Sequence, residues 1–207
     1  MHEIADFRSD TVTRPTPEMY EAMAKAPVGD DVLGDDPTII ELEALGAELM
    51  GFEASLFCPS GTQANQIAFR VHGRPGDEVI VEASAHTFAN EGGALAGING
   101  LHPRTLAGNR GMLDLELVKK NIRGHDDHHA RTRIITLENT HNHAGGTVLP
   151  QDQVIALGTF ARDKGIAFHL DGARIANAAV ASGKSLAELC EPFDSATICL
   201  SKGLCAP

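Results

Sequence analysis

The sequence predicts an α/β fold with a doubly wound, mostly parallel sheet and helices on both faces. Short apolar runs rich in β-branched residues alternate along the chain with segments of helical pattern, which is the order of strand–helix–strand units. Several of these runs end in turns of small and polar residues, as at the strand ends where open parallel sheets bind ligands. A hydrophobic content of 43% with 22% charged residues over 207 residues suits one sizeable core.

The elements are expected in a regular order. Thr16 followed by Pro17 is typical of a helix start, and Thr38 with Glu41 has the spacing of a capping box that begins a second helix. Period-3.6 segments predict helices over residues 16–25, 38–50, 61–72, 86–96, 114–122, 150–164 and 173–181. Apolar runs bounded by turn residues predict strands over residues 54–58, 78–82, 100–105, 133–138, 166–170 and 197–200.

The charge balance limits the possible partners. With 17 basic and 28 acidic residues the net charge is −11, which disfavours nucleic acid and anionic membranes as partners. No basic segment followed by an apolar run begins the chain, and no uncharged stretch approaches membrane-spanning length, so a cytoplasmic location is expected. The four cysteines lack Cys-x-x-Cys spacing and are expected to be reduced packing residues.

Two strand ends carry groups of complementary chemistry. Lys202 follows the run 197–200 in a turn of small residues, where a partly desolvated amine could act as a nucleophile. Asp171 follows the run 166–170, and its ordinary alternative role is to cap the next helix. Pyridoxal phosphate (PLP) requires such a pair, a lysine that captures its aldehyde and an anion that keeps the pyridine nitrogen protonated.

A third strand end offers a place for an anion. Gly61, Thr62 and Gln63 begin the helix expected over residues 61–72, where backbone amides and a hydroxyl meet the positive end of the helix dipole. Such a Ser-Gly-Thr sequence is often only a helix cap. Together with Asp171 and Lys202, it indicates a phosphate-binding cup.

A histidine-rich segment gives an alternative. His125, His128 and His129 lie with two aspartates in an expected loop, and imidazole and carboxylate are ligands that zinc accepts. The segment lies in an expected loop and not on a helix, so we expect no metal site there.

Six segments in order along the chain resemble the low-specificity L-threonine aldolases, which are PLP enzymes of the fold-type I superfamily. They are Asp6–Thr16, Gly29–Pro37, Pro59–Gln63, Glu138–Asn142, His169–Ile175 and Leu200–Pro207. The resemblance implies PLP as cofactor and cleavage of L-threonine or L-allo-threonine to glycine and acetaldehyde. It also implies a small amino-acid substrate and a homodimer or homotetramer.

The resemblance assigns roles to single residues. Lys202 would hold the cofactor and His86 would stack on its ring. His128 would lie near the substrate β-hydroxyl, and Ser9 would bind the substrate carboxylate. Arg174 would bind either the substrate carboxylate or the oxygen on the PLP ring. These roles come from the family and not from the spacing of the residues.

The resemblance is incomplete, because family members continue beyond the lysine turn. Residues 1–207 would correspond to the N-terminal portion of the PLP-binding large domain, without the small C-terminal domain, and this chain is expected to turn over threonine poorly by itself. A β-eliminating lyase or aminotransferase would use Asp171 and Lys202 in the same way, so these alternatives stay open. A catalytically incomplete fragment and a histidine-rich metal-binding protein are further alternatives.

Overall fold

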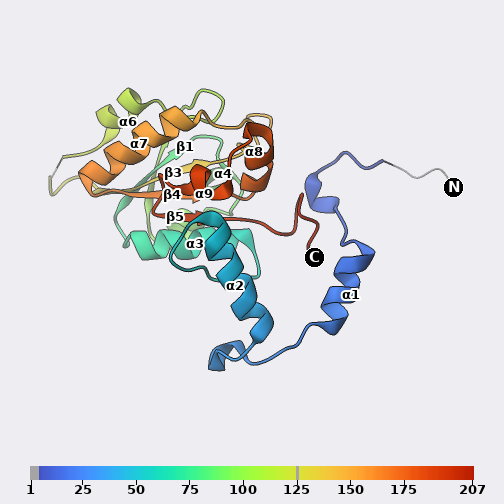
Figure 1. The fold of residues 1–207 in the computed structure, drawn as a ribbon. Coiled ribbons are helices and arrows are strands. Elements are labelled where there is room, and N and C mark those ends of the chain that lie inside the picture. The colour runs from blue at the N-terminus through green and yellow to red at the C-terminus, as the bar shows by residue number, and fades with distance from the viewer. Residues whose placement is uncertain (1–4, 125) are drawn as a thin grey trace. The chain divides into compact units, whose positions relative to one another are not determined.

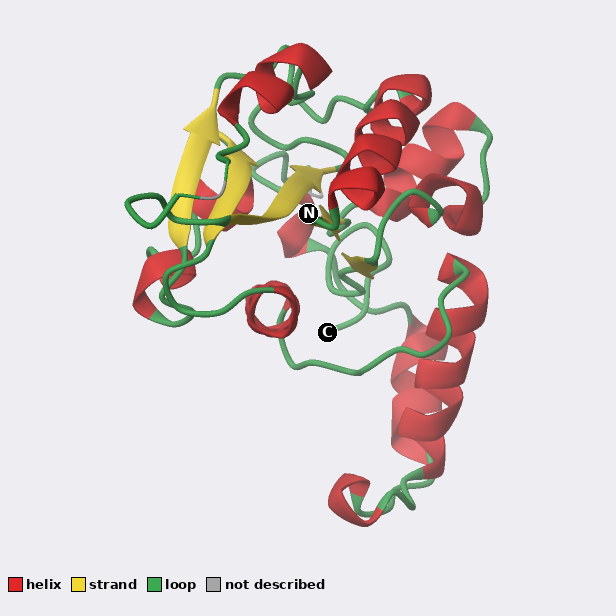
Figure 2. Cartoon of the chain, turned by 90° about the vertical axis from the view of Figure 1, so that its left-hand side faces the viewer, coloured by secondary structure: helices red, strands yellow, loops and turns green. Residues whose placement is uncertain are grey.

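The computed structural model describes residues 5–124 and 126–207 and divides the chain into two compact units. Unit 1 contains residues 1–57 together with residues 199–207, and unit 2 contains residues 58–198. All strands of the described chain belong to unit 2, whereas unit 1 consists of helices and loops (Figure 1; Figure 2).

Unit 2 is built around a five-stranded sheet in the order β2-β1-β3-β4-β5, in which every neighbouring pair is parallel. Its strands are β1 (Glu78–Glu82), β2 (His102–Leu106), β3 (Thr132–Glu138), β4 (Ala167–Asp171) and β5 (Ser195–Thr197). Its helices are α3 (Gly61–His72), α4 (His86–Ala89), α5 (Ala94–Gly97), α6 (Leu115–Asn121), α7 (Gln151–Lys164), α8 (Ile175–Ser182) and α9 (Leu186–Cys190). Helix α3 covers one face of the sheet, and α6 and α7 cover the other (Figure 1). The predicted α/β fold with a parallel sheet is therefore confirmed.

The core of unit 2 explains why the central strands read as continuous apolar runs. Strand β1 is buried along its whole length, and β3 is buried over most of it, because helices pack on both faces of the sheet. One core cluster joins α3, α5 and the sheet, and it consists of Phe69, Val79, Leu95, Leu101 and Ile134.

Local signals set several helix ends in unit 2. The Ser60 hydroxyl accepts from the backbone N–H of Gln63 and so caps α3, and Asp114 caps α6 in the same way. Helix α7 ends at Gly165, whose φ of 63° lies in the left-handed region that glycine adopts without strain.

Two predicted strands differ from the structure. Residues 54–58 form no strand, because they pair with no strand of the described chain. The backbone N–H of Phe57 instead donates to the Glu43 carboxylate. The run 197–200 contributes only Thr197 to β5, which begins at Ser195. Among the described strands β5 pairs with β4 alone, and that pairing ends where Asp171 lies opposite Thr197.

Two predicted helix signals were also wrong in detail. The helix expected from residue 38 begins at Pro37, and its cap is Asp36, whose carboxylate accepts from the N–H groups of Thr38 and Ile39. The capping box between Thr38 and Glu41 is therefore not used. The helix expected over residues 86–96 is split into α4 and α5, since Gly92 and Gly93 both have positive φ.

Unit 1 consists of short helical elements tied together by caps. They are η1 (Asp10–Val12), α1 (Pro17–Lys25), η2 (Asp31–Leu33) and α2 (Pro37–Met50). The predicted start of α1 is confirmed, because the Thr16 hydroxyl accepts from the N–H of Met19 and Pro17 is the first helical residue. The Thr13 hydroxyl donates to the carbonyl oxygen of Lys202 at 2.7 Å, which joins the N-terminal arm to the lysine turn within this unit.

Among the helices that the structure describes, none has the length and apolar character needed to cross a membrane.

Candidate active site

The carboxyl ends of three central strands bring buried acids to one edge of the sheet in unit 2. Strands β1, β3 and β4 end at Glu82, Glu138 and Asp171, and all three side chains are buried. Glu138 and Asp171 are paired in the strand register, so they are direct neighbours across the ladder. Asp171 was predicted to lie at the carboxyl end of its strand, and it is the last residue of β4. Open parallel sheets bind ligands at such ends.

Asp171 is held by two hydrogen bonds in a buried, acidic environment. Its Oδ1 accepts from the N–H of Ala173, and its Oδ2 accepts from the side-chain amide of Asn65 at 3.1 Å. Burial, together with the negative charges of Glu138 and Glu91, raises the pKa of Asp171 to about 6. The alternative role as helix cap is limited to the Ala173 contact, since α8 begins at Ile175 after Arg174.

Asn65, on the second turn of α3, organises the groups around Asp171. Its amide nitrogen donates to both Asp171 and Glu91, at 3.1 and 2.9 Å. Its carbonyl oxygen accepts from the Thr197 hydroxyl at 3.0 Å and from Nε2 of His169 at 3.2 Å. The amide thus uses two donors and two acceptors while only 2% exposed, so a side chain that lacks any of them leaves a buried partner unpaired.

His86 lies beside this group at the start of α4. Its Nδ1 donates to the buried Glu91 carboxylate at 3.1 Å, and the imidazole remains partly exposed. The hydrogen bond to Glu91 raises the pKa of His86, although burial opposes the change, and the charge of Asp171 adds to the increase. The other Glu91 oxygen accepts from the Gln66 side chain at 2.6 Å, so Glu91 fixes the orientation of the His86 ring.

A second layer of hydrogen bonds holds the loops that follow β1 and β3. Glu138 accepts from the backbone N–H groups of His86 and Asn142, at 2.7 and 2.8 Å. Behind it, Nε2 of the fully buried His141 donates to Glu82 at 3.1 Å. These contacts fix the backbone on which His86 is carried.

His169 is a neutral packing partner and not a proton carrier. Burial lowers its pKa to about 3. Its Nε2 donates to Asn65, so its Nδ1 accepts from the Ser195 hydroxyl at 2.8 Å. Its contribution is to orient Asn65 from behind.

The start of α3 fits an anion only in part as predicted. The N–H of Gln63 is used by the Ser60 cap, so this amide does not face a ligand. Among the described hydrogen bonds, none uses the backbone N–H of Gly61 or Thr62, and the Thr62 side chain is exposed. Asn65 lies about one helical turn after Gly61 and Thr62. The start of α3 could therefore bind an anion while Asn65, on the same helix, holds Asp171 beside a cation.

The remaining predicted site residues are Arg174, which follows Asp171 by three positions, and Ser9, Lys202 and His128, which lie in other parts of the described chain. Arg174 is half-buried and immediately precedes α8. Ser9 and Lys202 belong to unit 1, where Ser9 caps η1 by accepting from the N–H of Thr11. The arm that carries Ser9 is the one that Thr13 joins to Lys202.

His128 is not brought to Asp171 within unit 2. It lies in the loop that enters β3 at its amino end, whereas Asp171 is at the carboxyl end of the neighbouring β4. Its side chain is 91% exposed and pairs with Asp126 at 2.9 Å. His129 is also exposed, and His125 lies outside the described residues. The roles of His128, Ser9, Arg174 and Lys202 stay predictions.

Asp171 and two side chains beside it could act together as ligands of a cation. The described chain has one group of three possible ligands whose atoms all lie within 4.8 Å of one another, formed by His86, Glu91 and Asp171. A protonated ring nitrogen and a metal ion would both be favoured by these charges.

Sequence reasoning missed Asn65 and Glu91 as members of the site. Asn65 follows Gly61 by four residues, so its place on the same helix face was a usable signal. Glu91 gave no such signal, because it lies in the short break between α4 and α5, which the sequence predicted as continuous helix.

The geometry can be compared with known proteins. The sequence profile of the beta-eliminating lyase family, described as "Beta-eliminating lyase", matches residues 6–207. A low specificity L-threonine aldolase from Escherichia coli O157:H7 is 49% identical over 203 residues, which are 98% of this chain and 60% of that protein. A probable low-specificity L-threonine aldolase 2 from Arabidopsis thaliana is 44% identical over 98% of this chain and 58% of its own length. The chain thus spans about 60% of the length of the relatives it matches.

A solved structure of Leishmania major threonine aldolase has the same fold. It superposes with a TM-score of 0.79 over 90% of this chain and 55% of its own, at 23% sequence identity. The resemblance to this group of proteins, expected from the six sequence segments, is confirmed by these matches.

Proposed function

This chain belongs to the beta-eliminating lyase family, and we propose that its protein is a PLP-dependent aldolase that cleaves L-threonine or L-allo-threonine to glycine and acetaldehyde. The observation that carries the proposal is the buried Asp171, fixed by Asn65 at a parallel strand end beside His86. The 49% identity to a protein named low specificity L-threonine aldolase supports the choice of reaction.

The residues of unit 2 fit the cofactor by their chemistry. The raised pKa of Asp171 shows that its carboxylate is buried beside other negative charges, so a nearby positive charge would stabilise it. A protonated pyridine nitrogen would supply that charge. Gly61 and Thr62 offer backbone amides at a helix start for a phosphate. When bound, PLP supplies an electron sink for the charge left when the Cα–Cβ bond breaks.

The chain's own residues would then bind, orient and move protons. Asp171 would hold a proton on the ring nitrogen, and Asn65 would keep the carboxylate in place. His86, fixed by Glu91, would cover the ring face. Lys202 would anchor the cofactor.

The substrate roles rest on the family resemblance. Ser9 and Arg174 would bind the substrate carboxylate, and His128, or a water that it holds, would accept the β-hydroxyl proton. His128 lies at the amino end of β3 and Asp171 at the carboxyl end of the neighbouring β4, so the role of His128 is tested separately by the turnover of a His128 variant.

Several properties of the whole protein belong to the same proposal. We propose that residues 1–207 are the N-terminal portion of a PLP-binding large domain, that the assembled protein is a homodimer or homotetramer, and that it is cytoplasmic. The substrate would be a free amino acid.

The proposal is tested by PLP binding and by product analysis. Addition of PLP to the whole protein should give a visible absorbance band that persists after gel filtration. L-threonine should then yield equal amounts of glycine and acetaldehyde. A bound band with pyruvate or a keto acid as product would favour a β-eliminating lyase or aminotransferase instead. A protein that acquires no band would contradict the cofactor.

A further inference from the structure

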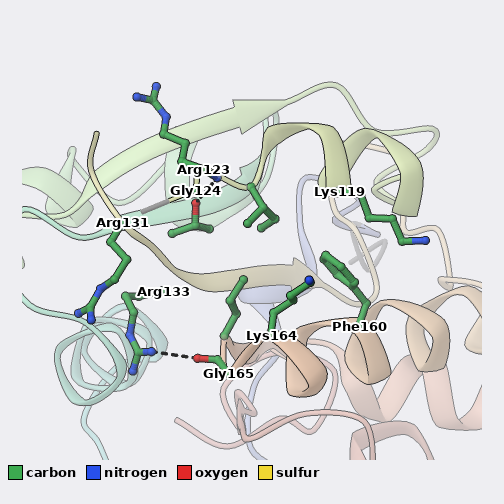
Figure 3. A pocket seen from close by; sticks show the side chains of 11 residues that line it. Lys119, Arg123, Gly124, Arg131, Arg133, Phe160, Lys164 and Gly165 are labelled. Atoms are coloured by element: carbon green, nitrogen blue, oxygen red, sulfur yellow. Dashed lines mark hydrogen bonds between the residues drawn. The ribbon is translucent and has the colours of Figure 1, made fainter. Parts of the chain in front are cut away.

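A cavity of about 720 Å³ opens at the amino ends of β3 and β4, whereas Asp171 lies at the carboxyl end of β4. The start of β3, the loop before it, the ends of α6 and α7 and the residues before β4 form its walls (Figure 3). Cavities of this size commonly take small organic ligands. None of the site residues proposed above lines it.

The lining of this cavity carries a concentrated positive charge. Its basic side chains are Lys119, Arg123, Arg131, Arg133 and Lys164. No acidic residue belongs to the described lining, although the chain as a whole has a net charge of −11. The cluster therefore departs from the overall charge of the protein.

Neighbouring acids neutralise only part of this charge. Lys119, Arg123 and Arg131 pair with Glu116, Glu78 and Asp77, respectively. The buried Glu78 is shared, because Arg104 also pairs with it at 2.8 Å.

The two remaining cations have no carboxylate partner among the described ion pairs. Arg133 donates from Nη1 to the carbonyl oxygen of Gly165 at 2.9 Å, which leaves its other N–H groups available (Figure 3). The Lys164 amine lies 6.0 Å from the centre of the Phe160 ring. Arg133 and Lys164 thus come from β3 and from the end of α7 to line one cavity.

The cavity also has an apolar part. It is lined by the partly exposed Ile122 and Phe160 and by the buried Ile166, together with the basic side chains. A surface of this kind recognises a molecule with an apolar body and a phosphate or carboxylate head, because each part of the ligand meets its complement.

We propose that this cavity binds a small organic anion that joins an apolar or aromatic body to a phosphate or carboxylate group. The basic side chains of the lining, among them Arg133 and Lys164, bind the anionic group, and Ile122, Ile166 and Phe160 contact the body. A nucleic acid is disfavoured by the net charge of −11. The site is separate from the proposed PLP site, since β3 and β4 run from the cavity toward Glu138 and Asp171.

The test uses phenyl phosphate as probe and isoleucine methyl NMR as readout. The protein is loaded with PLP and freed of excess PLP by gel filtration before the titration. Bound PLP keeps the probe from the helix start at Gly61, whereas free PLP, which also joins an aromatic ring to a phosphate, would compete for the cavity. Phenyl phosphate should shift the methyl signals of Ile122 and Ile166 and leave Ile175, beyond the carboxyl end of β4, unchanged. Inorganic phosphate and benzyl alcohol should each bind at least tenfold more weakly than phenyl phosphate. Lys164→Gln and Arg133→Gln should each weaken phenyl phosphate binding by about tenfold, as expected for the loss of one charge-assisted contact.

The matched control is Lys184→Gln, which removes one positive charge from an exposed position between α8 and α9. It should leave the affinity unchanged. Unmoved Ile122 and Ile166 signals, equal binding of benzyl alcohol, or an equal loss in Lys184→Gln would overturn the proposal. The methyl signals report binding whether or not the protein takes PLP, so this result is independent of the proposed function.

Discussion

The side-chain amide of Asn65 donates to the carboxylate of Asp171 at 3.1 Å, although 106 positions separate the two residues. The same amide nitrogen reaches Glu91, and the carbonyl oxygen is bound by Thr197 and His169. One buried side chain on α3 therefore joins β4, β5 and the segment after α4. Packing of α3 on the sheet and the geometry of the proposed site depend on the same hydrogen bonds.

Asn65→Ala should destabilise unit 2. The substitution leaves buried polar groups on Asp171, Glu91 and Thr197 short of a partner, and each such group typically costs about 1–3 kcal/mol. Urea unfolding followed by circular dichroism should show a lower midpoint. Asn177→Ala, on an exposed position of α8, should change the unfolding free energy by less than about 0.5 kcal/mol. Equal midpoints for the two variants would contradict the central role of Asn65.

The raised pKa of Asp171 predicts a pH dependence of stability in the protein without PLP. Between about pH 4 and pH 6 the folded carboxyl keeps its proton while the unfolded one has released it. The folded state then binds more protons, so its stability falls as the pH rises through this window and this contribution levels off above about pH 6. Each unit of pKa difference corresponds to about 1.4 kcal/mol.

Asp171→Asn removes this titration and keeps the shape of the side chain. Urea midpoints at pH 4, 5, 6 and 7 should therefore decline less steeply in the variant than in the parent chain. Parallel curves would mean that Asp171 titrates at its ordinary pKa.

Glu91→Gln should lower the pKa of His86. The hydrogen bond from Nδ1 to a charged carboxylate is the largest cause of the raised pKa, and a neutral amide stabilises the imidazolium less. An NMR titration of the His86 ring, assigned by its absence in His86→Asn, measures the change. Glu188→Gln removes a carboxylate from an exposed position of α9 and should leave the pKa of His86 as it is. A common pKa in parent and Glu91→Gln would show that the hydrogen bond to Glu91 does not raise the pKa of His86.

The sheet could be predicted closely because its signals are local. Strand β1 was expected with its observed bounds, and Asp171 was expected at the end of the strand it terminates. These strands are buried between helices, so their apolar runs stand out in the sequence. The run at residues 54–58 has the same appearance, but it pairs with no strand of the described chain.

The candidate site was less accessible to sequence reasoning. His86, Asp171 and the start of α3 follow expected elements and could be named from their positions along the chain. The contact of Asn65 with Glu91 joins segments 26 positions apart and depends on how α3 packs on the sheet. Neither hydropathy nor propensity records that packing, so the acidic partner of His86 could not be foreseen.

The proposed base role of His128 has a direct test in turnover. If His128 accepts the β-hydroxyl proton, His128→Ala should lower kcat for acetaldehyde release by about 10²- to 10⁴-fold. His129→Ala is the matched control, since it removes a neighbouring exposed imidazole from the same loop. The assay requires a protein that binds PLP and releases acetaldehyde before substitution. Full turnover in both variants would remove His128 from the mechanism, in keeping with its place at the amino end of β3.

Borohydride reduction should identify Lys202 as the residue that holds PLP. The lysine turn is tied to the N-terminal arm by the hydrogen bond from Thr13, so its backbone is held within unit 1. Reduction in the presence of PLP, followed by proteolysis and mass spectrometry, should add the cofactor mass to the peptide that contains Lys202. Lys202→Ala and Lys202→Arg should both lose this label, because the arginine keeps the positive charge but has no amine that can capture an aldehyde. Lys184→Ala should keep it. A label on another lysine, or one that survives in Lys202→Arg, would place the cofactor attachment elsewhere and separate that question from the role of Asp171.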